Sequence, residues 1–245
     1  MNGSNPMLSE KIFGRSGGVD AVSRMTARGA YSKTVALLLV AVAAAALPVS
    51  KYFDSGTTDS LIPYLLIGMI GGLLVALPTF FVPRIAPWTA PLYAALEGLF
   101  LGAASTVLEL QYPGIAIQAV GLTFSVLLVM LFLYRTGIIK VTQRLRTGVI
   151  AAIFGVLVFY LVSMVVSLFG VNTDVLFNGD PIGIGVSLVI VGIAAFHLLL
   201  DFDFIESASA GGAPKYMEWL GALGLMITLV WLYMHLLRLL SQLRR

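Results

Sequence analysis

The sequence predicts an all-α integral membrane protein built as a bundle of seven transmembrane helices. Of its 245 residues, 59% are hydrophobic and 11% are charged, and the mean hydropathy is +0.97. A soluble domain of average composition is about 25% charged, so this chain is far too apolar for that class. Seven apolar runs approach or exceed the ~20 residues that a helix needs to cross a bilayer. The connections between them are too short for a second domain.

The predicted domain boundary lies at residue 33. Residues 1–32 are polar, contain Gly-Gly and Asn-Pro pairs, and carry four of the fifteen basic residues. This composition predicts a flexible cytoplasmic tail, followed by a membrane-embedded helical domain over 33–245. The apolar run begins too late, and the basic region before it is too long, for a cleaved signal peptide.

The seven runs follow one another with connections marked by Pro, Gly, Asp and Asn. They cover residues 34–49, 61–82, 88–108, 115–134, 148–169, 182–200 and 217–240. The sixth run either ends at residue 200 or continues as a helix to residue 206. Small residues spaced four apart favour close helix packing in a membrane. Such pairs are Gly68 with Gly72, Gly98 with Gly102, and Ala151 with Gly155.

The distribution of basic residues predicts the orientation of the bundle. Eleven of the fifteen Lys and Arg residues lie before the first apolar run, over 1–33, and in the second, fourth and sixth connections. Cytoplasmic loops carry an excess of positive charge, so the N-terminus is expected in the cytoplasm. Three of the other four lie at the end of the last segment, which therefore either crosses the membrane against the rule or returns to the cytoplasmic side. We expect a crossing.

The end of the sixth run carries the most informative polar residues. His197 and Asp201 are one helical turn apart and share a face, while Asp203 and Glu206 lie on another face. An ionised side chain inside a bilayer is costly, which makes intramembrane acids candidates for function. Asp203 and Glu206 also fit a solvated helix end. Asp201 follows three leucines, so burial would favour its neutral form, whereas a charged His197 would favour its ionised form.

Glu97 is a second intramembrane acid, in the middle of the third run. No basic residue lies within a helical turn of it. Its carboxyl is therefore expected to be neutral or partnered. It either bonds a neighbouring helix or lines a polar cavity inside the bundle.

The sequence argues against an enzyme, a cofactor and a metal centre. It has no cysteine, and its two histidines are too far apart for a zinc motif. The nearest match to an intramembrane serine protease, at Gly185 and Ser187, has Leu where a small residue is needed. Aspartyl protease motifs and phosphate-binding glycine loops do not occur. We expect no catalytic residues and no nucleic-acid partner.

Four stretches of the chain resemble the Bax inhibitor-1 family, the YccA-like proteins with a transmembrane Bax-inhibitor motif, and above all its bacterial branch. They are Leu96-Glu97-Gly98-Leu99-Phe100-Leu101-Gly102, the basic connection over 134–148, Leu199-Leu200-Asp201-Phe202-Asp203-Phe204-Ile205-Glu206, and Leu236-Leu237-Arg238-Leu239. The resemblance covers nearly everything after the tail. It implies six helices around a largely enclosed seventh, in the inner membrane of a bacterial cell.

The resemblance also implies an activity, a pH-sensitive calcium leak in which an acid of the sixth helix pairs with an acid of the seventh. Asp201 matches the first acid, but Thr228 stands where the second is expected, and no acid follows Glu218. The pair of carboxylates that shares a proton, which the resemblance implies, therefore cannot be assigned to the sixth and seventh helices of this chain. A partner for Asp201 would have to be His197, Asp203, Glu97 or another group.

The leading functional prediction is a calcium or cation leak, or a proton-coupled exchange pathway. Buried acids in a helical bundle can replace part of a cation's hydration shell, so calcium ions and protons are the expected small partners. The predicted pathway and pH-sensing residues are Asp201, His197, Asp203, Glu97 and Glu206. The alternative is a non-conducting protein of the membrane stress response, or a regulator of proteases, that binds membrane-protein partners.

Overall fold

The structure, a computed structural model, describes residues 24–169 and 179–245, and within these ranges it contains helices and no β-strand. The long helices are α2 (Ala27–Ser55), α3 (Ile62–Phe81), α4 (Ala86–Gln111), α5 (Ile115–Arg135), α6 (Gln143–Leu168), α7 (Pro181–Ala210) and α8 (Met217–Leu243). Short 3₁₀ turns, η3 (Thr58–Leu61) and η4 (Pro83–Ile85), precede α3 and α4. Seven helices are long and apolar enough to cross a membrane, which confirms the predicted fold class.

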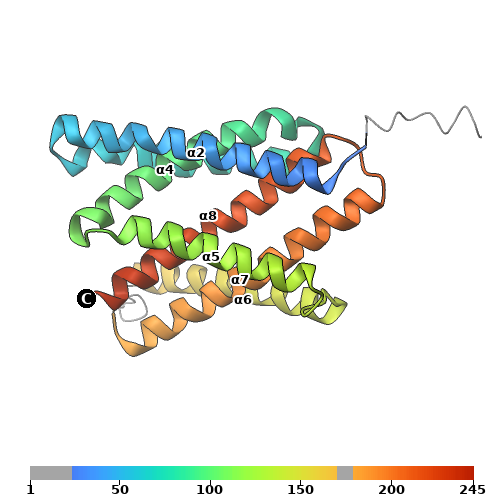
Figure 1. Cartoon of the computed structure of the whole chain (residues 1–245). Coiled ribbons are helices and arrows are strands. Elements are labelled where there is room, and N and C mark those ends of the chain that lie inside the picture. The colour runs from blue at the N-terminus through green and yellow to red at the C-terminus, as the bar shows by residue number, and fades with distance from the viewer. Residues whose placement is uncertain (1–23, 170–178) are drawn as a thin grey trace, which may run out of the picture.

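Helix α8 is the centre of the bundle. It runs obliquely between α2 and α4 on one side and α5 and α7 on the other, and it contacts all four (Figure 1). Within its most apolar stretch 67% of the residues are buried, against 11 to 39% in the other six helices. The prediction that the last helix is largely enclosed is therefore confirmed. Helix α8 ends opposite the place where α2 begins, so it extends from one end of the bundle to the other.

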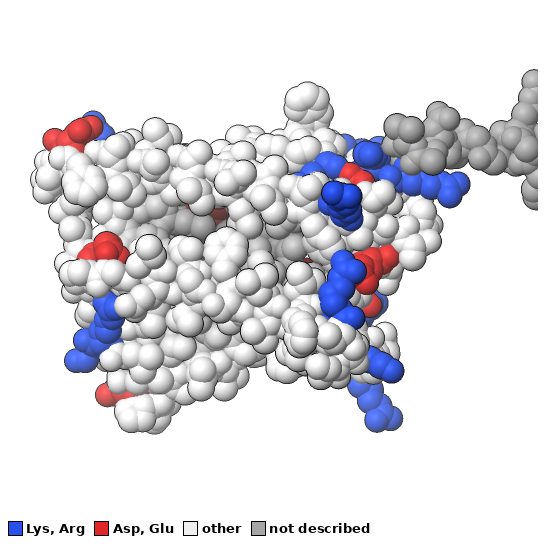
Figure 2. Space-filling view, in the orientation of Figure 1, with Lys and Arg blue, Asp and Glu red and all other residues white. Residues whose placement is uncertain are grey.

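The surface has the charge distribution of a membrane-spanning protein. Figure 2 shows Lys, Arg, Asp and Glu near the two ends of the helices, with a wide uncharged belt between them. Leu, Ile, Val and Phe side chains of the outer helices are exposed within the spanning segments. Such a surface requires a lipid environment, because a contiguous apolar belt of this extent is not found on soluble monomers.

Two glycines set the close approach of α4 to α2. A Cβ at Gly98 or Gly102 would overlap the α2 backbone at Ala41 and Ala45 respectively. The predicted packing role of this pair is confirmed, since only glycine lets the two backbones come so near. The third predicted pair differs, because a Cβ on Gly155 of α6 would meet nothing within 4 Å. Helix α6 is correspondingly peripheral and packs mainly on α7.

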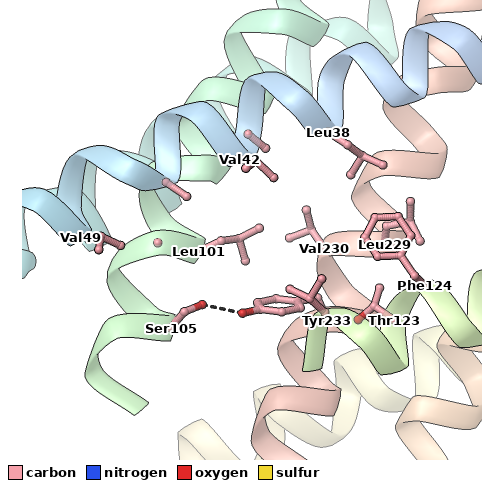
Figure 3. A pocket seen from close by; sticks show the side chains of 14 residues that line it. Leu38, Val42, Val49, Leu101, Ser105, Thr123, Phe124, Leu229, Val230 and Tyr233 are labelled. Carbon is pink, nitrogen blue, oxygen red and sulfur yellow. Dashed lines mark hydrogen bonds between the residues drawn. The ribbon is translucent and has the colours of Figure 1, made fainter. Parts of the chain in front are cut away.

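One side of α8 borders an apolar cavity of about 260 Å³ between α2, α4, α5 and α8 (Figure 3). Its lining includes Leu229, Val230 and Tyr233 of α8. Tyr233 and Ser105 of α4 join their hydroxyls at 2.7 Å, which satisfies both inside the bundle. The lining contains no charged side chain, so this cavity offers nothing to hold a cation.

The folded domain begins earlier than residue 33. Helix α2 starts at Ala27, with Thr26 as its N-cap, and the side chain of Met25 is buried. The hydroxyl of Thr26 accepts a hydrogen bond from Gly29 N at 3.0 Å, as a capping threonine does. The predicted boundary is therefore wrong by several residues. Residues 1–23 lie outside the described ranges, so the tail itself stays a prediction.

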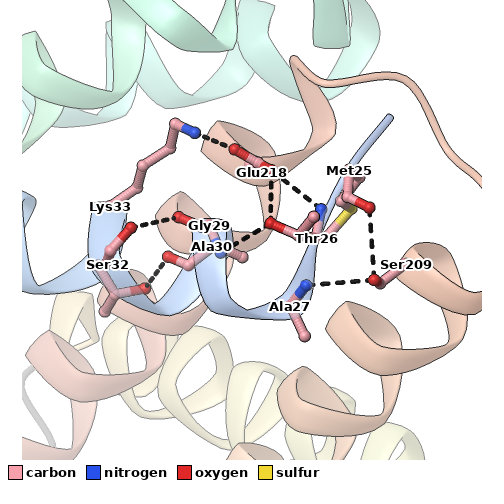
Figure 4. A network of polar contacts seen from close by, with 10 residues as sticks. Met25, Thr26, Ala27, Gly29, Ala30, Ser32, Lys33, Ser209 and Glu218 are labelled. Carbon is pink, nitrogen blue, oxygen red and sulfur yellow. Dashed lines mark hydrogen bonds and ion pairs between the residues drawn. The ribbon is translucent and has the colours of Figure 1, made fainter. Parts of the chain in front are cut away.

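A buried carboxylate explains why the chain is ordered before α2. Glu218, in the first turn of α8, is 1% exposed and pairs with Lys33 of α2 (Figure 4). It also accepts hydrogen bonds from the backbone N and the hydroxyl of Thr26, at 2.9 and 3.0 Å. Burial of a charged group is tolerated only with such partners. Glu218 therefore ties the start of α2 to the start of α8.

The end of α7 completes this network, which we call the N-terminal latch. Ser209 accepts a hydrogen bond from Ala27 N at 3.1 Å, and Met25 N donates to the Ala213 carbonyl at 2.7 Å. The latch therefore joins α2, α7, α8 and the α7–α8 connection at one end of the bundle (Figure 4).

Glu97 lies where α4 meets α3. Its carboxyl hydrogen-bonds Tyr93, one turn earlier in α4. A Cβ on Gly72 of α3 would lie 2.8 Å from Glu97 Oε1, so the carboxyl occupies the space left by this glycine. Among the described residues Glu97 makes no ion pair. It thus belongs to the contact between α3 and α4.

We predict that Lys33→Met destabilises the fold by roughly 3 kcal/mol, because it leaves the Glu218 carboxylate buried without its cation. The apparent melting temperature in detergent should fall clearly below that of the wild type. The double variant Lys33→Met/Glu218→Leu should recover part of the loss, since it removes both charges. As a control, Arg146→Met breaks an ion pair with Asp203 whose side chains are 47% and 21% exposed, and it should cost less than about 1 kcal/mol. Equal melting of the Lys33 variant and the wild type would contradict the role of the latch.

We also predict that Glu97→Gln melts like the wild type, because an amide can donate and accept hydrogen bonds as a protonated acid does. Glu97→Leu should lose about 1 kcal/mol, the usual net value of a hydrogen bond. Gly72→Ala should be destabilising as well, since its methyl group would meet the carboxyl. Equal melting temperatures for the Gln, Leu and wild-type proteins would show that the carboxyl makes no contact that matters to stability.

Candidate functional site

The candidate site lies where α7 faces the middle of α8. Asp201 and His197 are one turn apart on α7, and both are directed towards α8 around Gly224 and Thr228. Asp201 is nine residues before the end of α7, which places it about 14 Å inside that end of the helix. Thr228 is close to the midpoint of α8. The site is thus well inside the spanning part of the bundle, which excludes a solvated helix end for Asp201.

The Asp201 carboxyl has buried apolar residues next to it in α7, and one of its oxygens lacks a hydrogen-bond partner among the described residues. Leu198, Leu199 and Phe202 are each at most 1% exposed. Asp201 Oδ2 is itself buried, and no hydrogen-bond partner for it exists within residues 24–169 and 179–245. Gly224 leaves room opposite the carboxyl, since a Cβ there would come no closer than 3.9 Å to Oδ1. A buried carboxyl oxygen without a partner is uncommon and commonly marks a site for water or an ion.

His197, one of the alternatives considered as a partner of Asp201, bonds Thr228 instead. Its Nδ1 lies 3.0 Å from the hydroxyl of Thr228, rather than bonding the Asp201 carboxyl. The same threonine hydroxyl interacts with Asp201. Thr228, the residue that replaces the second acid of the resemblance, therefore stands between the two α7 side chains. A hydroxyl can serve both neighbours because it donates one hydrogen bond and accepts others.

Asp203 and Glu206 occupy the other face of α7, as their spacing predicted. Asp203 pairs with Arg146 at the start of α6 at 2.5 Å, and Glu206 pairs with Arg135 at the end of α5 at 3.2 Å. Both pairs are partly exposed. They join the ends of three helices, and each exposed pair contributes at most about 1 kcal/mol.

The structure therefore divides the five predicted residues into three places. Asp201 and His197 come together at α8, Asp203 and Glu206 lie at the end of the bundle, and Glu97 lies between α3 and α4. Neither Asp203 nor Glu97 is the partner of Asp201. Within the described residues, no group of three or more His, Asp or Glu side chains could hold a metal ion.

Sequence reasoning missed a set of polar and aromatic side chains beyond Thr228. No functional role was predicted for Trp231 or for His235, whose distance from His197 in the sequence excludes a zinc motif. In the structure the Trp231 ring lies between His197 and His235, with centroid distances of 6.4 and 5.7 Å. Thr228, Trp231 and His235 are three and then four positions apart. This spacing could have shown that they share one helix face.

The side chains of Asp201 and Thr228 provide oxygen atoms that can contact a cation or take up a proton. Asp201 offers a carboxyl oxygen that has no hydrogen-bond partner among the described residues, and Thr228 offers a hydroxyl oxygen beside it. Oxygen ligands suit hard cations, and an isolated carboxyl can also take up a proton. Two protein oxygens are far fewer than the six to eight that calcium takes, so a cation here would keep most of its water. The site suits transient contact with a passing ion.

Comparison with known proteins gives a single result. The chain matches the family model described as Bax inhibitor 1 like over residues 5–245. No curated protein and no solved structure matches it. The family match includes all seven helices and the Asp201 site, and it agrees with the resemblance found in the sequence. An all-helical bundle with seven potential membrane spans, matched over almost its whole length, makes this chain a member of the Bax inhibitor 1-like family.

Proposed function

We propose that this protein is a pH-sensitive pathway for cations, a calcium leak or a proton-coupled exchanger, and that Asp201 is the group whose charge controls it. The carrying observation is the buried Oδ2 of Asp201, which has no hydrogen-bond partner among the described residues. A structural carboxyl of this kind would be paired, as Asp203, Glu206 and Glu218 are. A buried carboxyl oxygen without a hydrogen-bond partner lowers the stability of the fold. A role in binding cations and protons would explain why such an oxygen is present.

The charge of the carboxyl can act as a switch for cation passage. When ionised, Asp201 attracts a cation and supplies an oxygen ligand; when protonated, it loses that attraction. The described residues provide no basic side chain bonded to it that would hold it permanently ionised. Cation flux is therefore expected to rise with pH. A single carboxyl should give a weaker pH dependence than two carboxylates that share a proton.

We further propose that the latch end of the bundle faces the cytoplasm. In Figure 2 many of the Lys and Arg side chains gather at the end where α2 begins, which agrees with the excess of positive charge expected on that side. The resemblance to the bacterial branch favours the inner membrane of a bacterial cell. Asp201 would then lie about 14 Å inside the cytoplasmic end of α7.

We predict that Asp201→Asn abolishes the pH dependence of calcium flux, because an amide of the same shape does not ionise. The measurement is uptake of calcium into liposomes that contain purified protein and a calcium-sensitive dye, from acidic to alkaline pH. Asp203→Asn is the matched control, since it changes an acid two residues away on the other face of α7. It should keep the wild-type pH profile. An Asp201→Asn protein whose flux follows pH as the wild type does would refute the proposed switch.

The same measurement tests the alternative function. If the wild-type protein carries no calcium at any pH, the pathway proposal fails. A non-conducting protein that regulates membrane proteases or other partners then becomes the better account.

The orientation has its own prediction. Reporter domains fused after Gly212 and after Arg245 should lie on opposite sides of the membrane, with the first in the cytoplasm, because α8 runs between the two ends of the bundle. The activities of a cytoplasmic and a periplasmic reporter measure this directly. Reporters on the same side would exclude a crossing by the last helix.

A further inference from the structure

One face of α8 carries a continuous row of polar and aromatic side chains. Its members recur at intervals of three and four residues, which places them on the same side of a helix. The row consists of Gly224, Thr228, Trp231, His235 and Arg238. It lies opposite the α8 residues that border the apolar cavity, namely Leu229, Val230 and Tyr233. The central helix thus has a polar side and an apolar side.

The side chains of this row form an unbroken series of contacts from the Asp201 site outwards. Thr228 meets His197 at 3.0 Å, and the Trp231 ring lies between His197 and His235. The His235 ring is 6.3 Å from the ring of Tyr160 on α6. Arg238 donates a hydrogen bond to the Tyr160 hydroxyl at 3.4 Å. The series therefore passes from α7, along α8, to α6.

The row covers a large part of the membrane. Arg238 is ten positions after Thr228, which is about 15 Å along the helix, or half of a hydrocarbon core of ~30 Å. It leads from the middle of the bundle towards the end at which α8 terminates. That is the end opposite the latch.

Two buried atoms indicate water, one on this row and one at the Asp201 site on α7. His235 is 9% exposed, and its Nδ1 is buried and finds no hydrogen-bond partner in the described part of the chain. Asp201 Oδ2, at the inner end of the series of contacts, is likewise buried and without a hydrogen-bond partner among the described residues. Leaving a buried polar atom unsatisfied is unfavourable, and such atoms are normally satisfied by ordered water when protein groups do not reach them.

The outer part of the row favours protons over metal ions. Beyond Thr228, the side chains in contact are an indole, an imidazole and a guanidinium on α8 and the phenol of Tyr160 on α6, and none of these is a carboxylate. An imidazole can accept a proton on one nitrogen and release one from the other. Water and protons are therefore the species that fit this side of α8.

We propose that a file of water molecules runs between α8, α7 and α6 from the C-terminal end of the bundle to Asp201, with Trp231 at its narrowest point. This inference rests on the proposed function and deepens it. The file lets Asp201 exchange protons with the side of the membrane opposite the latch. Transport by this protein is then coupled to protons, rather than being a simple calcium leak.

The absence of cysteine from the chain makes this directly testable. Single-cysteine variants Thr228→Cys and His235→Cys would be treated in detergent with a small, charged methanethiosulfonate reagent, which requires water around the thiol. Matched controls at similar depth on the other side of α8 are Met226→Cys and Leu237→Cys, both 0% exposed. We expect the two row positions to react on the order of tenfold faster than the controls. Mass spectrometry of the intact protein measures the rates.

A second substitution tests the narrow point. Trp231→Ala, made in the Thr228→Cys protein, should speed labelling at 228 severalfold, because Thr228 lies inward of the indole. It should leave labelling of His235→Cys unchanged, since His235 lies outward of it. Equal labelling of row and control positions in variants that elute and melt as folded proteins would overturn the water file. Faster labelling of both positions after Trp231→Ala would overturn the role of Trp231.

The result is independent of transport. Labelling of the row without any calcium flux would leave the water file standing and remove the proposed function. If calcium flux depends on Asp201 but the row positions are not labelled, the proposed function stands. The water file as the path for protons would then be refuted.

Discussion

The whole structure depends on the enclosure of α8. A bilayer provides no hydrogen-bond partners, so polar side chains can cross it only where other helices surround them. With 67% of its most apolar stretch buried, α8 is the one helix of the described chain that can carry Glu218, Thr228, His235 and Arg238 without exposing them widely to lipid. The glycine contacts that bring α4 against α2 serve this enclosure, because they let the outer helices close around the central one. The polar chemistry of the protein therefore gathers on α8.

Two kinds of buried carboxyl illustrate how this enclosure is used. Glu218 has Lys33 and two hydrogen-bond donors from Thr26, and these contacts tie the first helix to the last. Asp201 has a hydroxyl beside it and an oxygen with no partner in the described residues. The first arrangement stabilises a fold, whereas the second reduces stability and is typical of a functional site. The proposal of an ion-binding role for Asp201 rests on this contrast.

The replacement of an expected acid by Thr228 gives this member of the family its own character. A second carboxylate would compete for a proton and hold the charge of the pair near one unit. A hydroxyl cannot take part in that competition, but it bonds His197 and connects Asp201 to the row on α8. Where the resemblance implies two acids, this chain thus places one acid beside a threonine hydroxyl, with an imidazole on the other side of that hydroxyl.

The sequence by itself determined the fold class, the number of spanning helices and the separation of Asp201 and His197 from Asp203 and Glu206, because hydropathy and helical spacing depend only on order along the chain. The family resemblance added the central place of the last helix and the position of Thr228. Only the tertiary structure decided which side chains meet. Glu218, 185 residues from Lys33, could not be assigned to the latch, and the start of α2 was misplaced for that reason. Likewise, Tyr160 of α6 reaches His235 of α8 only because the helices cross, a relation that no periodicity within one helix contains.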